Sequence, residues 1–144
     1  MIYKKSWKYI LIRDNCNNHR IGYRYYRLKA VKDFSDVTKW NLGGFITSYH
    51  NLSQTGNCWI YDNAKVHFKA FIYDNAIVKD DATVGGNTQI YGNAIIEGKV
   101  WIHDNVRVYE DAVVTGGAEI SGRTRVFGNQ IISGNRFIQS TYDI

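Results

Sequence analysis

A branched aliphatic residue recurs at every sixth position across most of the chain, and this period constrains the fold more than any other feature. Its positions are Ile60, Val66, Ile72, Val78, Val84, Ile90, Ile96, Ile102, Val108, Val114, Ile120, Val126, Ile132 and Ile138. A strand residue two positions earlier points the same way. The earlier positions are mostly small: Cys58, Ala64, Ala70, Ala76, Ala82, Thr88, Ala94, Val100, Val106, Ala112, Ala118 and Thr124. Both registers are therefore predicted to face one core.

Turn-forming pairs stand two and three residues after most of the branched residues, as in Asp62-Asn63, Asp74-Asn75, Gly92-Asn93 and Gly128-Asn129. Gly, Asn and Asp tolerate positive φ, whereas β-branched residues favour extended backbone. Each six-residue unit is therefore predicted to be a short strand followed by a corner. Three such units make one coil of a prism, and each coil stacks on the next.

The motif Ala-x-Ile/Val-x-Gly/Asp-Asn resembles the hexapeptide repeat of left-handed β-helices. The resemblance implies an all-β protein built as a three-sided, left-handed parallel β-helix of about five coils. The hand comes from the resemblance, because the general crossover rule favours the opposite hand.

The positive charge of the chain lies in its N-terminal part. Residues 1–57 hold 10 Lys and Arg against 3 Asp and Glu, whereas residues 58–144 hold 8 against 10. Residues 7–13 and 21–31 are predicted to form a β-hairpin. We therefore expect a basic, aromatic hairpin or cap over residues 1–42 and a solenoid over residues 43–144.

The second strand of this hairpin alternates basic and aromatic side chains. Contacts with an anionic partner are predicted for Tyr23, Arg24, Tyr25, Arg27 and Lys29. Arg and Lys contact phosphates and Tyr stacks on bases, so nucleic-acid binding through this region is one interpretation. In the other, the hairpin covers the open end of the solenoid and its cations protect the exposed edge. The two interpretations are compatible.

Residues 26–138 also resemble hexapeptide-repeat proteins common in phages and prophages. The leader carries this resemblance, in Tyr26-Arg27-Leu28-Lys29-Ala30-Val31-Lys32-Asp33-Phe34-Ser35-Asp36-Val37, Leu42-Gly43-Gly44-Phe45-Ile46, Asn51-Leu52-Ser53 and Gly56-Asn57-Cys58-Trp59-Ile60-Tyr61-Asp62-Asn63-Ala64. The resemblance implies a mobile-element context and a fold, but no reaction.

Two outward rows of the solenoid are unusual. An apolar row predicts self-association into a dimer or trimer, or cover by the N-terminal segment, and comprises Trp59, Ile77, Ile95, Val113 and Ile131. A second row predicts either a stacked aromatic column that stabilises the sheet or a partner-binding face, and comprises Tyr73, Tyr91, Tyr109 and Phe127 with Arg107 and Arg125 alongside.

The chain offers few groups for catalysis. Members of the wider hexapeptide superfamily with known activity are largely acyltransferases with a His base between subunits, so the resemblance brings forward His67 and His103. They are two coils apart, about 10 Å along the stack, which is too far to share a metal. His19 and His50 do not complete a three-His zinc site. We expect solvated histidines, no catalytic or metal-binding residues and no cofactor.

These features predict a non-enzymatic phage or prophage protein that binds a host protein or ribonucleoprotein and inhibits a defence complex such as CRISPR–Cas. The alternatives are a hexapeptide-repeat acyltransferase and a nucleic-acid-binding module. Residues 9–12 form an apolar run too short for a membrane span, and a location in the host cytoplasm is expected. Cys58 is predicted to be buried filler and Cys16 a free thiol.

Overall fold

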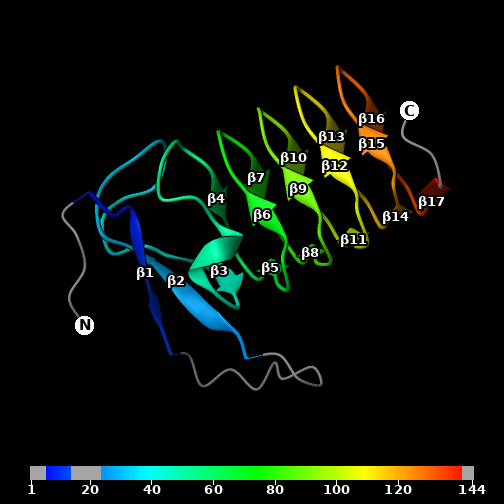
Figure 1. Cartoon of the computed structure of the whole chain (residues 1–144). Coiled ribbons are helices and arrows are strands. Elements are labelled where there is room, and N and C mark those ends of the chain that lie inside the picture. The colour runs from blue at the N-terminus through cyan, green and yellow to red at the C-terminus, as the bar shows by residue number, and fades with distance from the viewer. Residues whose placement is uncertain (1–5, 14–23, 141–144) are drawn as a thin grey trace.

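The protein is a rod of stacked three-sided coils with an antiparallel hairpin at its N-terminal end (Figure 1). This computed structural model describes residues 6–13 and 24–140. Within these ranges the only helical element is a short 3-10 helix, η1 (Tyr49–Asn51). No helix in the described part of the chain is long and apolar enough to cross a membrane.

The three sides of the rod are three sheets. The first has eight strands in the order β1 (Tyr9–Ile12), β2 (Tyr26–Ala30), β3 (Leu42–Ile46), β5 (Lys65–Val66), β8 (Thr83–Val84), β11 (Trp101–Ile102), β14 (Glu119–Gly122) and β17 (Phe137–Ser140). The second has five, in the order β16 (Ile131–Ile132), β13 (Val113–Val114), β10 (Ile95–Ile96), β7 (Ile77–Val78) and β4 (Trp59–Ile60). The third has four, in the order β15 (Arg125–Val126), β12 (Arg107–Val108), β9 (Gln89–Ile90) and β6 (Phe71–Ile72).

The inner strands of the solenoid are hydrogen-bonded to the coil before and to the coil after them. The backbone N–H of Ile77 donates to the carbonyl of Ala94 at 2.9 Å, and that of Ile95 to the carbonyl of Ala112 at 3.0 Å. The pairing is parallel, with Val78 beside Ile96 in the next coil. Two-residue strands are too short to be stable alone, so the stack itself holds them. The predicted all-β, three-sided parallel solenoid is confirmed.

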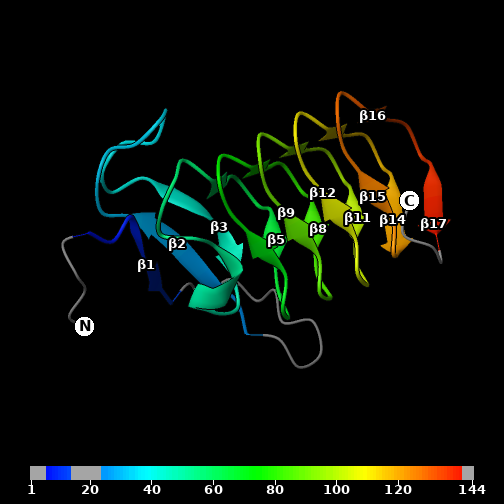
Figure 2. The ribbon, with the colours of Figure 1, turned by 45° about the horizontal axis from the view of Figure 1, so that its top comes forward.

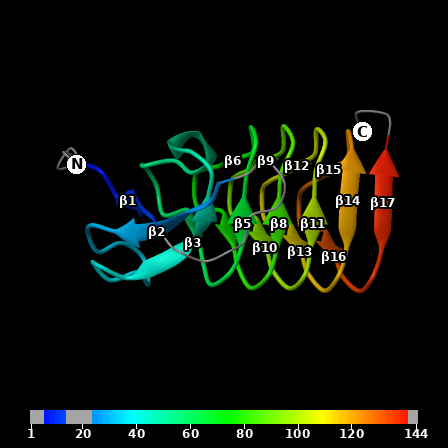
Figure 3. The same cartoon turned by 90° about the horizontal axis from the view of Figure 1, so that it is seen from below.

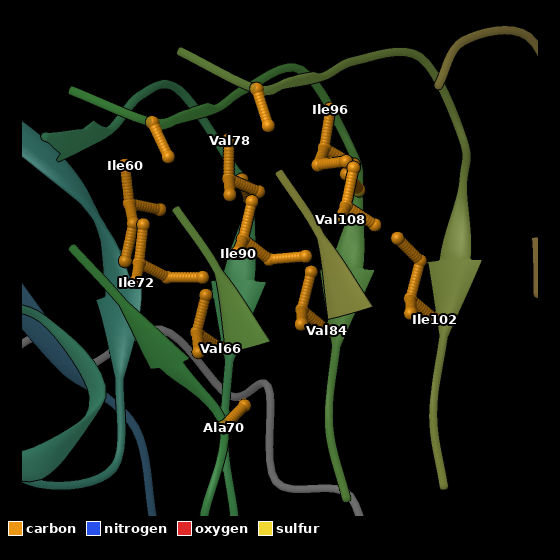
Figure 4. Close-up of a cluster of buried hydrophobic side chains, with 14 of the residues drawn as sticks. Ile60, Val66, Ala70, Ile72, Val78, Val84, Ile90, Ile96, Ile102 and Val108 are labelled. Atoms are coloured by element: carbon orange, nitrogen blue, oxygen red, sulfur yellow. The ribbon is translucent and has the colours of Figure 1, made fainter. Parts of the chain in front are cut away.

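The core is a column of branched side chains inside the prism, alternating with the smaller register. Figure 4 shows Ile60, Val78 and Ile96 projecting inward from one side, with Val84 and Ile102 coming from another. Most members of both predicted registers are essentially inaccessible to solvent. Ile138, in the last coil, is only partly buried against this core.

The corners have the left-handed backbone expected of Gly and Asp. Asp80 has φ 61° and Gly98, its counterpart in the next coil, has φ 80°. The Asp80 carboxylate accepts a hydrogen bond from the Gly98 N–H at 2.9 Å, which ties one corner to the next. An aspartate can therefore take this conformation where its side chain bonds the neighbouring coil.

The N-terminal hairpin extends the eight-stranded sheet instead of standing apart from it (Figures 2 and 3). Strand β2 pairs antiparallel with both β1 and β3, and β3 pairs parallel with β5. Tyr9 and Leu28 are fully buried in the same core as the coils. The second hairpin strand is shorter than predicted, 26–30 instead of 21–31. Residues 14–23, including Cys16 and Tyr23, lie outside the described part, and the division at residue 42 stays a prediction.

Candidate active site

His103 lies on the outer face of the eight-stranded sheet, directly after β11, between two carboxylates. Its Nδ1 is 3.2 Å from Oδ1 of Asp104, and its Nε2 is 3.0 Å from Oε2 of Glu119. Glu119 belongs to the next coil, where it pairs with Trp101 in the strand register. The stacking of coils therefore brings one imidazole and two carboxylates together, although His103 and Glu119 are 16 residues apart in the chain.

Asp104 is held at its corner by the next coil. Its Oδ2 accepts a hydrogen bond from the backbone N–H of Gly122 at 2.8 Å. This bond, with a smaller contribution from the His103 ring, holds the pKa of the Asp104 carboxyl below its ordinary value. The carboxylate is therefore ionised at neutral pH, with Oδ1 directed at the imidazole.

Exposed aromatic surface borders the histidine. The Trp101 ring lies 4.3 Å from the His103 ring, centroid to centroid, and Trp101 is 45% exposed. Phe137 stands beside Glu119 in the strand register and is 63% exposed. Large exposed aromatic side chains next to polar groups are typical of binding surfaces.

His67 follows β5 on the same eight-stranded sheet as His103, and its side chain extends toward the coil between them. The Tyr25 hydroxyl is 3.0 Å from Nδ1 of His67, and Tyr25 is buried. A Cβ atom on Gly85 would lie 2.5 Å from Nε2 of His67, so the ring occupies space that any side chain at residue 85 would fill. Gly85 donates its N–H to the carbonyl of Ile102, the residue before His103. The tip of His67 is thus one coil from His103, closer than the two-coil separation of their backbones.

Neither histidine is the solvated side chain that we expected from the sequence. Both are partly buried and both have side-chain partners. Asp104 and Glu119 were not predicted from the sequence to be neighbours of His103. The sequence contains the information to predict the contact with Glu119. Because the coils repeat every 18 residues, residues 16 apart, such as His103 and Glu119, are diagonal neighbours on adjacent strands.

The residues predicted to contact an anionic partner do not act as one set. Arg27 lies over the Phe45 ring at 4.6 Å and donates to the carbonyl of Gly43. Lys29 lies over the Trp40 ring, while Tyr25 turns toward His67. Arg24 is exposed. Tyr23 is outside the described residues, and anion binding by this segment stays a prediction.

The predicted partner-binding row forms a stacked column on the four-stranded sheet. Ring centroids are 4.8 Å apart from Tyr73 to Tyr91, 5.1 Å from Tyr91 to Tyr109 and 5.6 Å from Tyr109 to Phe127. The faces of these rings are therefore stacked on one another, and this stacking stabilises the packing of the coils. Arg107 and Arg125 are opposite each other on adjacent strands beside it. Partner binding by this row stays a prediction.

The apolar row predicted for self-association is covered at its N-terminal end only. Trp59 is 1% exposed and packs edge-on against Tyr9 and Phe34, which belong to the N-terminal segment. Ile131, at the other end, is 67% exposed. The N-terminal segment therefore covers Trp59, and self-association through the remaining residues of the row stays a prediction.

No group of three or more His, Cys, Asp or Glu side chains is arranged to hold a metal ion within residues 6–13 and 24–140. The cluster around His103 consists of one imidazole and two carboxylates, which are side chains that act as general acids and bases.

The coil geometry defines a β-solenoid of the hexapeptide-repeat type, and the sequence comparisons agree. Residues 70–86 and 89–104 match the family described as YdcK beta-solenoid repeat. A relative in Escherichia coli (strain K12), named uncharacterized acetyltransferase YdcK, is 41% identical over 61 residues. That alignment covers 42% of this chain and 15% of the relative, so the chain matches a small part of a longer protein.

This similarity corrects the function predicted from the sequence. The prediction of a non-enzymatic phage protein that inhibits a host defence complex is wrong, because the similarity is to a protein named as an acetyltransferase. It supports the alternative, a hexapeptide-repeat acyltransferase, and points toward an enzyme. The hexapeptide-repeat part of the resemblance is supported by the matched solenoid repeat.

Proposed function

We propose that this protein is an acetyltransferase and that His103 is its general base. The arrangement of His103 between Asp104 and Glu119, beside the exposed Trp101 ring, carries the proposal. The similarity to a protein named as an acetyltransferase supports the reaction class. The acceptor is a hydroxyl or amine whose proton must be removed during attack on the acetyl thioester.

Asp104 orients the base. With an acceptor in place of Glu119, the Asp104 carboxylate, which is fixed by Gly122, accepts the Nδ1 proton of His103, and the lone pair of the imidazole is then on Nε2. An acceptor hydroxyl or amine at Nε2 then passes its proton to His103 as it attacks the thioester carbonyl. In this arrangement Nδ1 serves for orientation and Nε2 for proton transfer.

In the absence of an acceptor the Glu119 carboxylate lies 3.0 Å from Nε2 of His103 and accepts a proton from it. Nε2 can act as a base only after an acceptor displaces Glu119 and this proton passes to solvent. The Glu119 side chain has several rotatable bonds and is partly exposed, so the acceptor can displace it without moving the backbone. Once displaced, the Glu119 carboxylate remains close enough to bind a positively charged or hydroxylated part of the acceptor. Trp101 provides an apolar surface for the acetyl donor next to the base.

The experiment measures acetyl-coenzyme A turnover with a panel of amine and hydroxyl acceptors. Replacing His103→Gln removes the base, and the rate is expected to fall about 100-fold or more. Glu119→Gln, which keeps the shape of the side chain, is expected to change the acceptor KM more than kcat.

His50→Gln is the matched control, because His50 is exposed and its ring contacts the Lys69 carbonyl on a different side of the coil. Its rate should equal that of the wild type. Turnover that survives unchanged in His103→Gln would show that another residue is the base, and absence of turnover with every acceptor would refute the proposal.

A further inference from the structure

Lys8 is a fully buried lysine at the junction of the hairpin and the solenoid. It is 1% exposed. Lysine is almost never fully buried unless its ammonium has polar partners. Here Nζ donates to the carbonyl of Cys58 at 2.6 Å and lies 3.3 Å from the carbonyl of Gly56. The Phe34 ring covers it, with its centroid 5.0 Å from Nζ.

The nearest side-chain atom with redox chemistry is the sulfur of Cys58. Nζ of Lys8 is 3.3 Å from Sγ of Cys58, and Cys58 is completely buried. Cys58 occupies the inward register that Ala64 and Ala70 fill on the next two sides of the coil and that Ala76 fills in the next coil, so packing requires only a small residue there. The sulfur contributes a reactive group at a position where alanine would suffice.

The backbone at Lys8, which carries the amine, is held in place by the side chain of Gln54. The side-chain carbonyl of Gln54 accepts hydrogen bonds from the N–H groups of Lys8 and Tyr9, at 2.7 Å and 3.1 Å. The Gln54 amide donates in turn to the carbonyl of Tyr9 at 3.1 Å. The contact between Nζ and Sγ therefore does not depend on a freely rotating surface chain.

Burial favours the uncharged form of both groups. It lowers the pKa of the Lys8 amine and raises the pKa of the Cys58 thiol, although each moderates the shift of the other. A neutral amine has a lone pair, which an ammonium lacks. The geometry thus places a nucleophilic nitrogen next to an oxidisable sulfur.

We propose that Lys8 and Cys58 form a covalent cross-link through one bridging oxygen atom, Nζ–O–Sγ, when the protein is exposed to dioxygen. The S–H bond and one N–H bond break, and an S–O bond and an O–N bond form. Sulfur and nitrogen together lose four electrons, which reduce one molecule of dioxygen. One of its oxygen atoms becomes the bridge and the other leaves as water with the two released hydrogens.

The cross-link would join the residue before β1 to the residue before β4. These residues are 50 positions apart in the chain, so the link closes a long loop. Closing a loop restricts the unfolded chain and stabilises the folded one. The site therefore makes the attachment of the hairpin to the solenoid dependent on oxidation.

The test measures the intact mass of the full chain carrying Cys16→Ser, which removes the other cysteine. After incubation in air-saturated buffer, a gain of about 14 Da is expected, corresponding to one oxygen gained and two hydrogens lost. A thiol reductant should reverse the gain, and peptide mapping should find residues 8 and 58 in one cross-linked species. The midpoint of thermal unfolding should be higher for the air-exposed sample than for one kept anaerobic.

Two variants in the same background separate the cross-link from ordinary oxidation. Cys58→Ala places the residue used in neighbouring coils at this position, and Lys8→Met keeps the length of the side chain without the amine. Neither should show the gain of about 14 Da, and Lys8→Met should show only a gain of about 16 Da or 32 Da, as sulfenic or sulfinic acid. A 14 Da gain that persists in either variant, or its absence from the parent chain, would overturn the proposal.

Discussion

Each inward position of a coil accepts side chains of a limited size, and a polar side chain there stabilises the fold only where it has a hydrogen-bond partner. Thr88 and Thr124 occupy the same inward position in coils two apart, with Val106 between them. The Thr124 hydroxyl donates to the carbonyl of Ser121 at 2.8 Å and accepts from the N–H of Ser140. Among the described residues, the buried Thr88 hydroxyl has no hydrogen-bond partner.

Replacing Thr88→Val is therefore expected to stabilise the protein. Valine has nearly the same shape, fits this position in the next coil, and removes a buried hydroxyl without a partner, so the free energy of unfolding should rise by about 1 kcal/mol. Chemical denaturation measures the change.

Thr124→Val is the matched control. It should lower the free energy of unfolding by about 1 kcal/mol, because two hydrogen bonds are lost. Equal effects of the two replacements would contradict the argument.

At the scale of the element, a six-residue unit combines a two-residue strand with a corner that must pass close to the next coil. Corner residues such as Gly98 and Gly128 both have positive φ, 80° and 61°. They differ in their surroundings. A Cβ on Gly98 would lie 2.5 Å from the carbonyl oxygen of Gly116, whereas a Cβ on Gly128 would meet nothing within 4 Å.

The replacement Gly98→Ala is expected to cost more stability than Gly128→Ala. Both replacements place an alanine at positive φ, which lowers the stability of the fold. Only Gly98→Ala also forces two coils apart, an overpacking that costs about 1 to 3 kcal/mol more. Thermal unfolding of the two variants measures the difference. If Gly128→Ala were as unstable as Gly98→Ala, backbone strain alone would explain both and the close stacking of corners would have no energetic role.

At the scale of the whole molecule, the two ends and the three sides of the rod differ in what covers them. The hairpin covers the N-terminal end and extends one side. The five-stranded side carries a row of apolar residues beyond the covered Trp59, namely Ile77, Ile95, Val113 and Ile131. A row of this kind favours contact with a second copy of the chain.

We therefore expect the wild type to self-associate and Ile95→Glu to be monomeric in sedimentation measurements. A buried carboxylate at the centre of the row would have to be desolvated in the assembly. Thr83→Glu is the control, because Thr83 is also outward and partly exposed but belongs to the eight-stranded sheet. A monomeric wild type would show that the row is not a contact between copies.

Several parts of the fold could be predicted from local rules. The period of six decides which residues point inward, and Gly, Asp and Asn decide where the chain turns, because both depend on nearby backbone geometry. The hairpin also followed from two strand-like segments, although the limits of its second strand did not. Rows 18 residues apart, including the aromatic column from Tyr73 to Phe127, follow directly from the stacking of coils.

The candidate site depended on features that the period does not determine. His103 meets Glu119 diagonally, and His67 meets Tyr25 from a segment 42 residues earlier. These contacts require particular side-chain torsions and the path of the hairpin across the sheet.

The sequence by itself thus determined the prism and the face on which each residue lies, since strand alternation and corner chemistry are local. Only the tertiary structure decided which polar groups meet, because hydrogen bonds between separate coils depend on distances of a few ångströms that are set by packing.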